Sequence, residues 1–233
     1  MRLRHIPGAE QMIEESPFVI QDARERKGRW QESLGAKAPL QIEIGMGKGR
    51  FILEQARKNP DLMFLGIERY STVLLKALRK RGEEEAPNLF YLCEDARKLG
   101  EIFGPGEVGR IYLNFSHPWP KKRNAGRRLT SPVYLGIYEQ FLTADGTVEF
   151  KTDNRDLFEY SLESIGQAGW RILASTFDLY ASDLAAGNVM TEYEMKFAAE
   201  GKPICKLIAA RREPEEGDFS AEKADRENGA HIL

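Results

Sequence analysis

The stretch QIEIGMGKG at residues 41–49 joins a short apolar run to three glycines at alternate positions. Glycine lets the chain turn sharply and lets a ligand approach the backbone, so this pattern predicts a strand, a tight turn and a helix start. The spacing GxGxG differs from the dinucleotide pattern GxGxxG and lacks the GK[ST] ending of a phosphate loop. A glycine turn alone also fits a purely structural strand–helix junction, so the surrounding residues must decide.

From residue 40 onward, short apolar runs alternate with amphipathic segments. The apolar runs are Leu40–Gly45, Met63–Glu68, Leu89–Cys93, Arg110–Phe115, Thr147–Lys151, Arg171–Asp178 and Ile204–Ala210. The amphipathic segments are Gly49–Lys58, Ser71–Arg81, Asp95–Phe103, Pro132–Leu142 and Asn154–Gly166. Repeated strand–helix units predict an α/β fold, a mostly parallel sheet with helices on both faces. The last two runs are joined by an irregular connection without a clear helix, which favours one antiparallel strand near the C-terminus.

The composition divides the chain into three parts. Residues 1–39 have mixed charge, and we expect them to form an N-terminal arm with one short helix around Asp22–Leu34. Residues 40–212 carry the regular pattern and are predicted to form the main domain. Residues 213–233 hold seven acids against two bases without periodicity, so we expect a disordered acidic tail.

Charge and composition narrow the functional classes. The net charge of the 233 residues is −2, so a nucleic-acid partner must be recognised through local charge. Cys93 and Cys205 lie in separate apolar runs, which predicts buried free thiols. The histidines are not spaced for a shared ligand, so no metal is expected. Neither a signal peptide nor an apolar run of about 20 residues is visible, and we therefore expect a cytoplasmic protein that does not contact the membrane.

Acidic residues accompany the glycine-rich turn. Glu43 lies two residues before the first glycine, Glu68 ends the second apolar run, and Glu94 with Asp95 ends the third. In an open α/β sheet these positions meet at one edge, where Glu68 is placed to bind ribose hydroxyls and Asp95 to lie near an adenine. A carboxylate at Glu43 repels pyrophosphate and attracts an ammonium or sulfonium group. The pattern favours S-adenosylmethionine as cofactor, although each acid alone also fits a solvated loop.

A stiff, basic loop follows the fourth apolar run. The segment NFSHPWPKKR at residues 114–123 places prolines on both sides of Trp119, and five bases lie within residues 121–128. No acid occurs from Ser116 to Tyr138. Such a loop suits an RNA backbone, and an exposed Trp can stack on a base. The simpler alternatives are a solvated basic patch and a Trp that fills the core beneath the loop.

Together these motifs resemble the bacterial tRNA (guanine-N7-)-methyltransferase family across roughly residues 40–211. The matching segments are IEIGMGKG, LGIE, the pair Glu94–Asp95, NFSHPWPKKR with RRLT, FKTDNRDLFEYSL, and TEYEMKF with GKPI. The resemblance implies a Rossmann-like class I methyltransferase fold with a seven-stranded sheet. It also implies methyl transfer from S-adenosylmethionine to N7 of a guanosine in the tRNA variable loop (position 46). The products would be 7-methylguanosine and S-adenosylhomocysteine.

The resemblance carries over individual residues. It assigns cofactor binding to Glu43, Gly45, Gly47, Glu68, Asp95 and His117. It assigns contact with the substrate nucleotide to Lys121, Asp153, Thr191, Glu192, Tyr193 and Glu194, and contact with RNA to Arg123, Arg127 and Arg128. Asp153 and Glu194 would accept hydrogen bonds from the guanine N1–H and exocyclic amine. The alternatives are that Asp153 caps the following helix and that Glu194 is an ordinary surface acid.

The chain departs from the family pattern at His117. The family has NFSDPWPK, with the aspartate regarded as catalytic and cofactor-contacting, whereas this chain has histidine there. Asn124 also stands where the family often has histidine. A carboxylate stabilises the positive charge that develops on the purine, and a protonated histidine opposes it, so we expect reduced but not abolished activity.

Other readings of the sequence remain open. Asn114, Pro118 and Trp119 loosely echo the (N/D)PP(aromatic) motif of methyltransferases that act on base amines. The histidine at position 117 also fits a tRNA-binding protein without catalysis. A nicotinamide dehydrogenase fits less well, because the glycine spacing differs. The protein is expected to be a monomer or homodimer.

Overall fold

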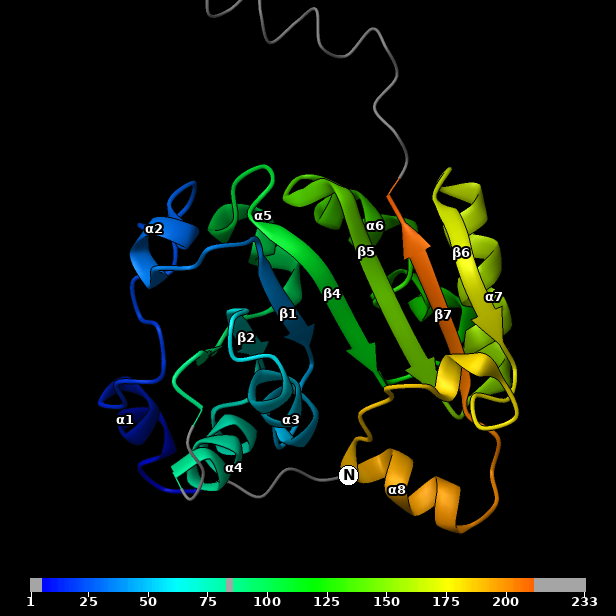
Figure 1. Cartoon of the computed structure of the whole chain (residues 1–233), viewed down its shortest axis with the longest axis horizontal. Coiled ribbons are helices and arrows are strands. Elements are labelled where there is room, and N and C mark those ends of the chain that lie inside the picture. The colour runs from blue at the N-terminus through cyan, green and yellow to red at the C-terminus, as the bar shows by residue number, and fades with distance from the viewer. Residues whose placement is uncertain (1–5, 83–85, 212–233) are drawn as a thin grey trace, which may run out of the picture.

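Seven strands form one sheet in the computed structural model, which describes residues 6–82 and 86–211 (Figure 1). The strands are β1 (Leu40–Ile44), β2 (Phe64–Ile67), β3 (Leu89–Leu92), β4 (Val108–Asn114), β5 (Leu142–Thr152), β6 (Arg171–Thr176) and β7 (Cys205–Ala210). The α-helices are α1 (Ala9–Glu14), α2 (Trp30–Leu34), α3 (Arg50–Lys58), α4 (Ser71–Gly82), α5 (Leu99–Ile102), α6 (Pro132–Glu139), α7 (Arg155–Gln167) and α8 (Glu192–Ala199). Short 3-10 helices are η1 (Ala96–Lys98), η2 (Lys122–Arg127) and η3 (Asp183–Ala185).

The sheet has the strand order β3-β2-β1-β4-β5-β7-β6. Strands β1 to β5 pair in parallel, and β7 runs antiparallel to both β5 and β6. The prediction of a mostly parallel sheet with one antiparallel strand near the C-terminus is confirmed. The chain builds β1, β2 and β3 in one direction and then returns to place β4 on the other side of β1. Such a reversal opens a crevice at the carboxyl ends of the two central strands.

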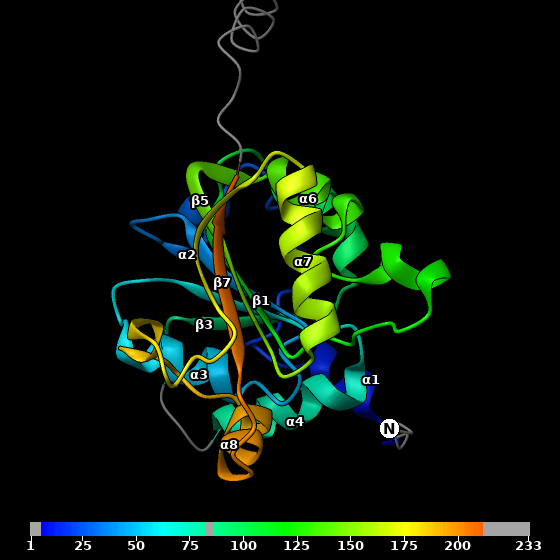
Figure 2. The ribbon, with the colours of Figure 1, turned by 90° about the vertical axis from the view of Figure 1, so that its right-hand side faces the viewer.

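Helices cover both faces of the sheet, but not equally (Figure 2). One apolar cluster joins β1, β4 and β5 to α5, α6 and α7, and it includes Ile42, Leu113 and Phe150. A second cluster joins α1, α3 and α4 to the β2–β3 side. On this second face, β4, β5 and β7 carry the polar side chains of Arg110, Glu149 and Lys206, which are linked by ion pairs. The layered core therefore leaves a polar strip beside α3.

The N-terminal segment differs from the single helix expected over residues 22–34. Only its last part forms helix α2, while α1 was not predicted, and Gly28 interrupts the segment at φ +79°. The Glu107 carboxylate accepts hydrogen bonds from the N–H groups of Gly28 and Trp30, at 3.0 and 2.7 Å. Trp30 is fully buried in the main core. The continuous helix was a wrong prediction because these long-range contacts fix a turn there.

The connection between the last two strands contains helix α8, so the expectation of an irregular segment was wrong. Thr191 caps this helix, because its hydroxyl accepts the N–H of Glu194 at 2.9 Å. The Glu194 carboxylate in turn accepts the N–H of Thr191 at 3.3 Å, which completes a capping box. Both Tyr193 and Met195 are exposed, so the helix lacks the apolar stripe by which helices are usually predicted.

Smaller corrections concern the third crossover and one cysteine. The helix predicted for residues 95–103 is a 3-10 turn followed by the short helix α5. Cys93 is exposed, contrary to prediction, whereas Cys205 is buried. Within the described ranges, none of the helices has the length and apolar composition needed to cross a bilayer. The predicted acidic tail lies outside the described residues, and the division into arm, domain and tail stays a prediction.

Candidate active site

The glycine turn (residues 45–49) lies at the carboxyl edge of the sheet, directly after β1. Gly45 and Gly47 adopt φ values of +74° and +60°, in the left-handed region that favours glycine. A Cβ atom built on either residue would meet no atom within 4 Å. The backbone therefore borders open space, which provides the close approach that a bound cofactor requires.

Glu43 brings a buried carboxylate to this edge. Its side chain is 2% exposed, and Oε1 accepts a hydrogen bond from Asn114 Nδ2 at 2.8 Å. Oε2 is buried and has no hydrogen-bond partner among the described residues. Burial raises the pKa of Glu43 to about 8, although the Asn114 bond and the Lys151 charge oppose the shift. A buried acceptor without a partner costs stability, so this oxygen is suited to a donor or cation on a ligand.

Glu68 follows β2 and supports the glycine turn. Its Oε2 accepts the N–H of Gly47 at 3.2 Å, and its Oε1 accepts the N–H of Tyr70 at 3.0 Å. Burial raises the pKa of this carboxyl. The contact brings together two residues that the sequence analysis assigned to cofactor binding, although they lie 21 residues apart.

Asp95 follows β3 and lies at the start of η1. Its carboxylate accepts hydrogen bonds from the Arg97 backbone N–H at 3.0 Å and from the Arg97 guanidinium at 2.9 and 3.0 Å. These bonds hold the pKa of Asp95 at about 2, so the carboxylate is ionised at neutral pH. The Arg69 guanidinium lies 4.0 Å from the same carboxylate. Asp95 is therefore a fixed anion, unlike the buried Glu43.

The β4 loop (residues 115–128) has a strained backbone. Phe115 and Trp119 adopt φ values of +50° and +44°, a region that costs a side-chain-bearing residue about 1 kcal/mol or more. His117 is exposed between them, and its Nδ1 accepts the N–H of Trp119 at 3.1 Å. Trp119 is half-buried, lies outside both core clusters and packs against the His117 ring at 4.7 Å. The alternative in which Trp119 fills the core is therefore wrong.

Two adjacent arginines end the β4 loop in different environments. Arg127 is exposed and places its guanidinium 4.9 Å from the centre of the Trp119 ring. Arg128 is half-buried and donates to the carbonyl oxygens of Pro118 and Trp119, at 3.0 and 3.1 Å. Its guanidinium also lies 4.1 Å from the centre of the Tyr160 ring. Arg128 therefore anchors the loop, whereas Arg127 faces solvent.

The other basic residues of the β4 loop are free of such anchoring. Lys121, Lys122 and Arg123 are all exposed at the start of η2. Figure 2 shows this bright-green segment projecting from the body on the side of α6 and α7. The exposed cations fit the predicted RNA contact, which stays a prediction.

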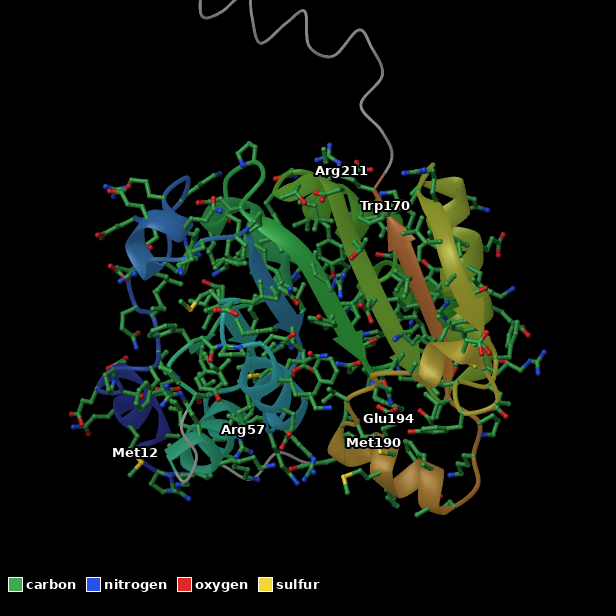
Figure 3. The ribbon with its side chains drawn as sticks, in the orientation of Figure 1. Met12, Arg57, Trp170, Met190, Glu194 and Arg211 are labelled. Carbon is green, nitrogen blue, oxygen red and sulfur yellow. The ribbon has the colours of Figure 1, made fainter. Side chains whose placement is uncertain are left out.

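Glu194 lies in the first turn of α8, and its fully buried side chain contacts Lys151 at the carboxyl end of β5 (Figure 3). Its Oε2 is 2.5 Å from Lys151 Nζ, while Oε1 accepts hydrogen bonds from Tyr180 Oη at 2.9 Å and Asn188 Nδ2 at 2.6 Å. The alternative of an ordinary surface acid is wrong. Both oxygens already have partners in this chain, so direct contact with guanine would require an exchange of partners.

Of the neighbouring predicted substrate residues, Glu192 and Tyr193 are more accessible, whereas Thr191 is buried. Glu192 forms ion pairs with Lys48, at 3.3 Å, and with Lys80, so it ties α8 to the glycine turn and to α4. Tyr193 is 54% exposed at the start of α8.

Asp153 is exposed after β5 and does not cap the next helix. Asn154 caps that helix instead, because its Oδ1 accepts the N–H of Leu157 at 2.8 Å. The capping alternative for Asp153 is therefore wrong, and its predicted contact with guanine stays a prediction.

Neither Asn114 nor Lys151 was predicted to bind the cofactor or the target nucleotide, and Asn114 was noted only for its loose similarity to a base-amine motif, yet both contribute to the site. Asn114 binds Glu43, and Lys151 pairs with Glu194. The available signal was that both residues lie at the carboxyl ends of central strands, next to residues already singled out. Tyr180 gave no comparable signal, because it reaches Glu194 from an irregular segment.

A cavity of about 470 Å³ adjoins this edge on the polar strip of the sheet. It runs between α3 and strands β4, β5 and β7, and its lining includes Asn114, Lys151 and Asn188. Among residues 6–82 and 86–211, no group of three His, Cys, Asp or Glu side chains is placed to hold a metal ion.

Comparisons with known proteins agree on one chemistry. Residues 37–207 match a family described as "Putative methyltransferase". A tRNA (guanine-N(7)-)-methyltransferase of Lachnoclostridium phytofermentans is 52% identical over 211 residues, which cover 91% of this chain and 99% of that protein. Proteins with the same description from Geobacillus thermodenitrificans and Listeria innocua are 50% and 49% identical, over 91% and 90% of this chain and 98% of each relative.

Solved structures with a similar fold are also methyltransferases. The 16S rRNA methyltransferase KamB has a TM-score of 0.58 at 14% identity, covering 78% of this chain and 92% of that one. The antibiotic-resistance methyltransferase Kmr has a TM-score of 0.56 at 17% identity, covering 81% and 93%. At this level of identity the similarity concerns the fold.

Proposed function

Because the chain belongs to the tRNA (guanine-N(7)-)-methyltransferase family, we infer that it transfers the methyl group of S-adenosylmethionine to N7 of a guanosine in tRNA. We place that guanosine in the variable loop, at position 46. The observation that carries the assignment in this molecule is the buried, unpartnered Oε2 of Glu43 beside the glycine turn. A site that offers a carboxylate to a ligand suits a cationic cofactor and disfavours a phosphate.

The residues at the glycine turn fit S-adenosylmethionine. Gly45 and Gly47 leave open space beside the backbone, and a cationic group that reached the buried Oε2 of Glu43 would be stabilised there. Glu68 and Asp95 supply acceptors at the ends of β2 and β3, where ribose and adenine are expected. When bound, S-adenosylmethionine supplies an electrophilic methyl group on a sulfonium. The chain's contribution is to hold these acceptors in place, since Glu68 braces the turn through Gly47.

Methylation at guanine N7 requires no general base, because N7 carries a lone pair and no proton. The chain must therefore align N7 with the methyl group and keep water out of the contact. As the purine gains positive charge, a nearby carboxylate would stabilise it. His117 stands where the family has that carboxylate, so this chain lacks the negative charge there, and we expect slower transfer.

Guanine selection is assigned to the residues between β5 and α8. Asp153 is an exposed carboxylate after β5, and Tyr193 is an exposed ring at the start of α8. A carboxylate that accepts the guanine N1–H and exocyclic amine would reject adenine, which has a different donor pattern. The start of α8 is held in place by the capping box between Thr191 and Glu194. The ion pairs of Glu192 with Lys48 and of Glu194 with Lys151 add to this support. Direct contact between Glu194 and guanine remains a prediction that needs the exchange of partners noted above.

RNA contact is assigned to the β4 loop. Lys121 lies nearest the strand end and is assigned to the target nucleotide, while Arg123 and Arg127 are assigned to the RNA backbone. Arg128 supports the loop from within through Pro118 and Trp119. Exposed cations of this kind bind phosphates with an affinity that falls steeply with salt.

Labelled methyl transfer to an unmodified tRNA transcript, followed by nucleoside analysis, tests the proposed function. We expect the label in 7-methylguanosine. Label on an exocyclic amine would identify a base-amine methyltransferase instead. Binding of tRNA without any transfer would identify a non-catalytic tRNA-binding protein, and either result would contradict the proposal.

A further inference from the structure

The side chain of His117 has a defined contact although it is exposed. Its Nδ1 accepts the backbone N–H of Trp119, two residues later, at 3.1 Å. The same Trp119 adopts a φ of +44°, a conformation that a residue with a Cβ atom rarely adopts. The two rings lie with their centres 4.7 Å apart. The imidazole therefore closes a short turn that ends at the strained residue.

Turns of this kind are normally closed by Asp or Asn, whose side-chain oxygen accepts the N–H two residues on. The Nδ1 atom of histidine is the same number of bonds from Cα as that oxygen. It can accept a hydrogen bond only while it carries no proton, so the contact with the Trp119 N–H fits the tautomer that has its proton on Nε2.

We propose that His117 is a positioning residue whose neutral imidazole accepts the backbone N–H of Trp119. Its function is to hold Trp119, and with it the ring that Arg127 covers, in one conformation at the substrate side of the site. Protonation of the imidazole places a donor against the Trp119 N–H and opens the turn. Methyl transfer by this chain therefore requires the deprotonated imidazole, and this inference rests on the proposed function.

Two charged side chains contact the same turn. The Arg127 guanidinium lies 4.9 Å from the centre of the Trp119 ring, and Arg128 donates to the carbonyl oxygens of Pro118 and Trp119.

Methyl transfer measured from about pH 8 to about pH 5.5 in the parent, His117→Asn and His117→Ala tests the proposal. Asparagine keeps an acceptor that does not titrate, whereas alanine removes it. We expect His117→Asn to recover most of an approximately tenfold loss seen with His117→Ala. The ratio of the rate at the higher pH to that at the lower should be about tenfold larger in the parent than in His117→Asn. Equal ratios, or an Asn variant as impaired as the Ala variant, would overturn the proposal.

A readout without RNA or cofactor separates this inference from the proposed function. In protein labelled with ¹⁵N-tryptophan, the Trp119 backbone amide signal should move on acidification in the parent and stay in place in His117→Asn. A variant with His5→Asn and His231→Asn should behave like the parent and excludes the other histidines. A moving signal with no methyl transfer would contradict only the proposed function. Normal transfer with a Trp119 signal that does not move would contradict only the role of His117.

Discussion

The glycine turn and the β4 loop meet at one edge of the sheet, yet their chemistry is opposite. Beside the glycine turn, Glu43 and Glu68 are acids that are 2% and 7% exposed. In the β4 loop, Lys121, Arg123 and Arg127 are exposed cations. Strain also differs, because the turn places glycine in the left-handed region, whereas the loop places Phe115 and Trp119 there.

This contrast follows from what each region binds. A small cationic cofactor is held by few groups, so buried carboxylates, whose interactions are strong and little screened by salt, suit it. A folded RNA offers many phosphates, so exposed cations suit it. Substitutions at the glycine turn should therefore weaken cofactor binding alone, and substitutions of the exposed cations in the β4 loop should weaken tRNA binding alone.

The largest effect is expected for Glu68→Ala. Loss of the carboxylate leaves the N–H groups of Gly47 and Tyr70 without their acceptor and removes the predicted ribose contact. Affinity for S-adenosylhomocysteine, measured by titration calorimetry, should fall by about 100-fold, while tRNA affinity changes by less than about twofold. Glu101→Ala, at an exposed carboxylate paired with Arg24, is the control. An equal loss of tRNA affinity would remove the proposed separation.

Cofactor affinity should depend on pH through Glu43. Its pKa is about 8 in the free protein, and a cationic ligand favours the ionised carboxylate. Affinity should therefore rise by up to about tenfold per pH unit and level off above about pH 8, with proton release on binding. Stability runs the opposite way: the raised pKa stabilises the fold below its ordinary value of 4.5, and this contribution is lost as pH rises through about 8. Glu43→Gln should flatten both profiles, and a parent profile that matches it would contradict the role of this acid.

His117→Asp should accelerate methyl transfer by about tenfold, because it restores a carboxylate beside the developing positive charge while keeping an acceptor for the Trp119 N–H. The melting temperature should change little by comparison. Single-turnover measurements with saturating cofactor and tRNA isolate the effect. Equal rates in parent and variant would show that charge at this position does not limit the reaction.

The smallest change in binding affinity is expected for the substitution of Arg127, which we compare with that of its neighbour Arg128. Arg127→Ala should weaken tRNA binding by about three- to fivefold and reduce the salt dependence by about one phosphate contact, without a change in melting temperature. Arg128→Ala should also lower the melting temperature, because Pro118 and Trp119 lose their donor. Identical behaviour of the two variants in filter binding and thermal unfolding would contradict the distinction between a contacting and an anchoring arginine.

The central strands could be predicted from the sequence because burial on both faces leaves continuous apolar runs. The run predicted over Leu40–Gly45 forms β1 from Leu40 to Ile44, and the glycine turn follows it as expected. Helix α8 escaped prediction, since Tyr193 and Met195 are exposed and its amphipathic pattern is weak. Its T-x-x-E start, from Thr191 to Glu194, was nevertheless a readable capping box.

The acids of the site could be located from their positions at strand ends, but their environments could not. Glu194 pairs with Lys151 across 43 residues, and nothing local to either residue indicates that pairing. The separation of Arg127 from Arg128 has the same origin, because only the folded loop brings Pro118 and Tyr160 to Arg128. Residue types and their order along the chain predicted which residues belong to the site. Only the tertiary contacts show which of them can contact a ligand and which hold other residues in place.

Replacing the target guanosine in the tRNA variable loop by 7-deazaguanosine tests the central claim most directly. The analogue keeps the Watson–Crick edge and lacks N7, so it removes only the atom that receives the methyl group. With the unmodified transcript we predict incorporation approaching about one methyl group per tRNA, and with the analogue none above background. Equal incorporation into both transcripts would contradict methylation at N7 of this guanosine.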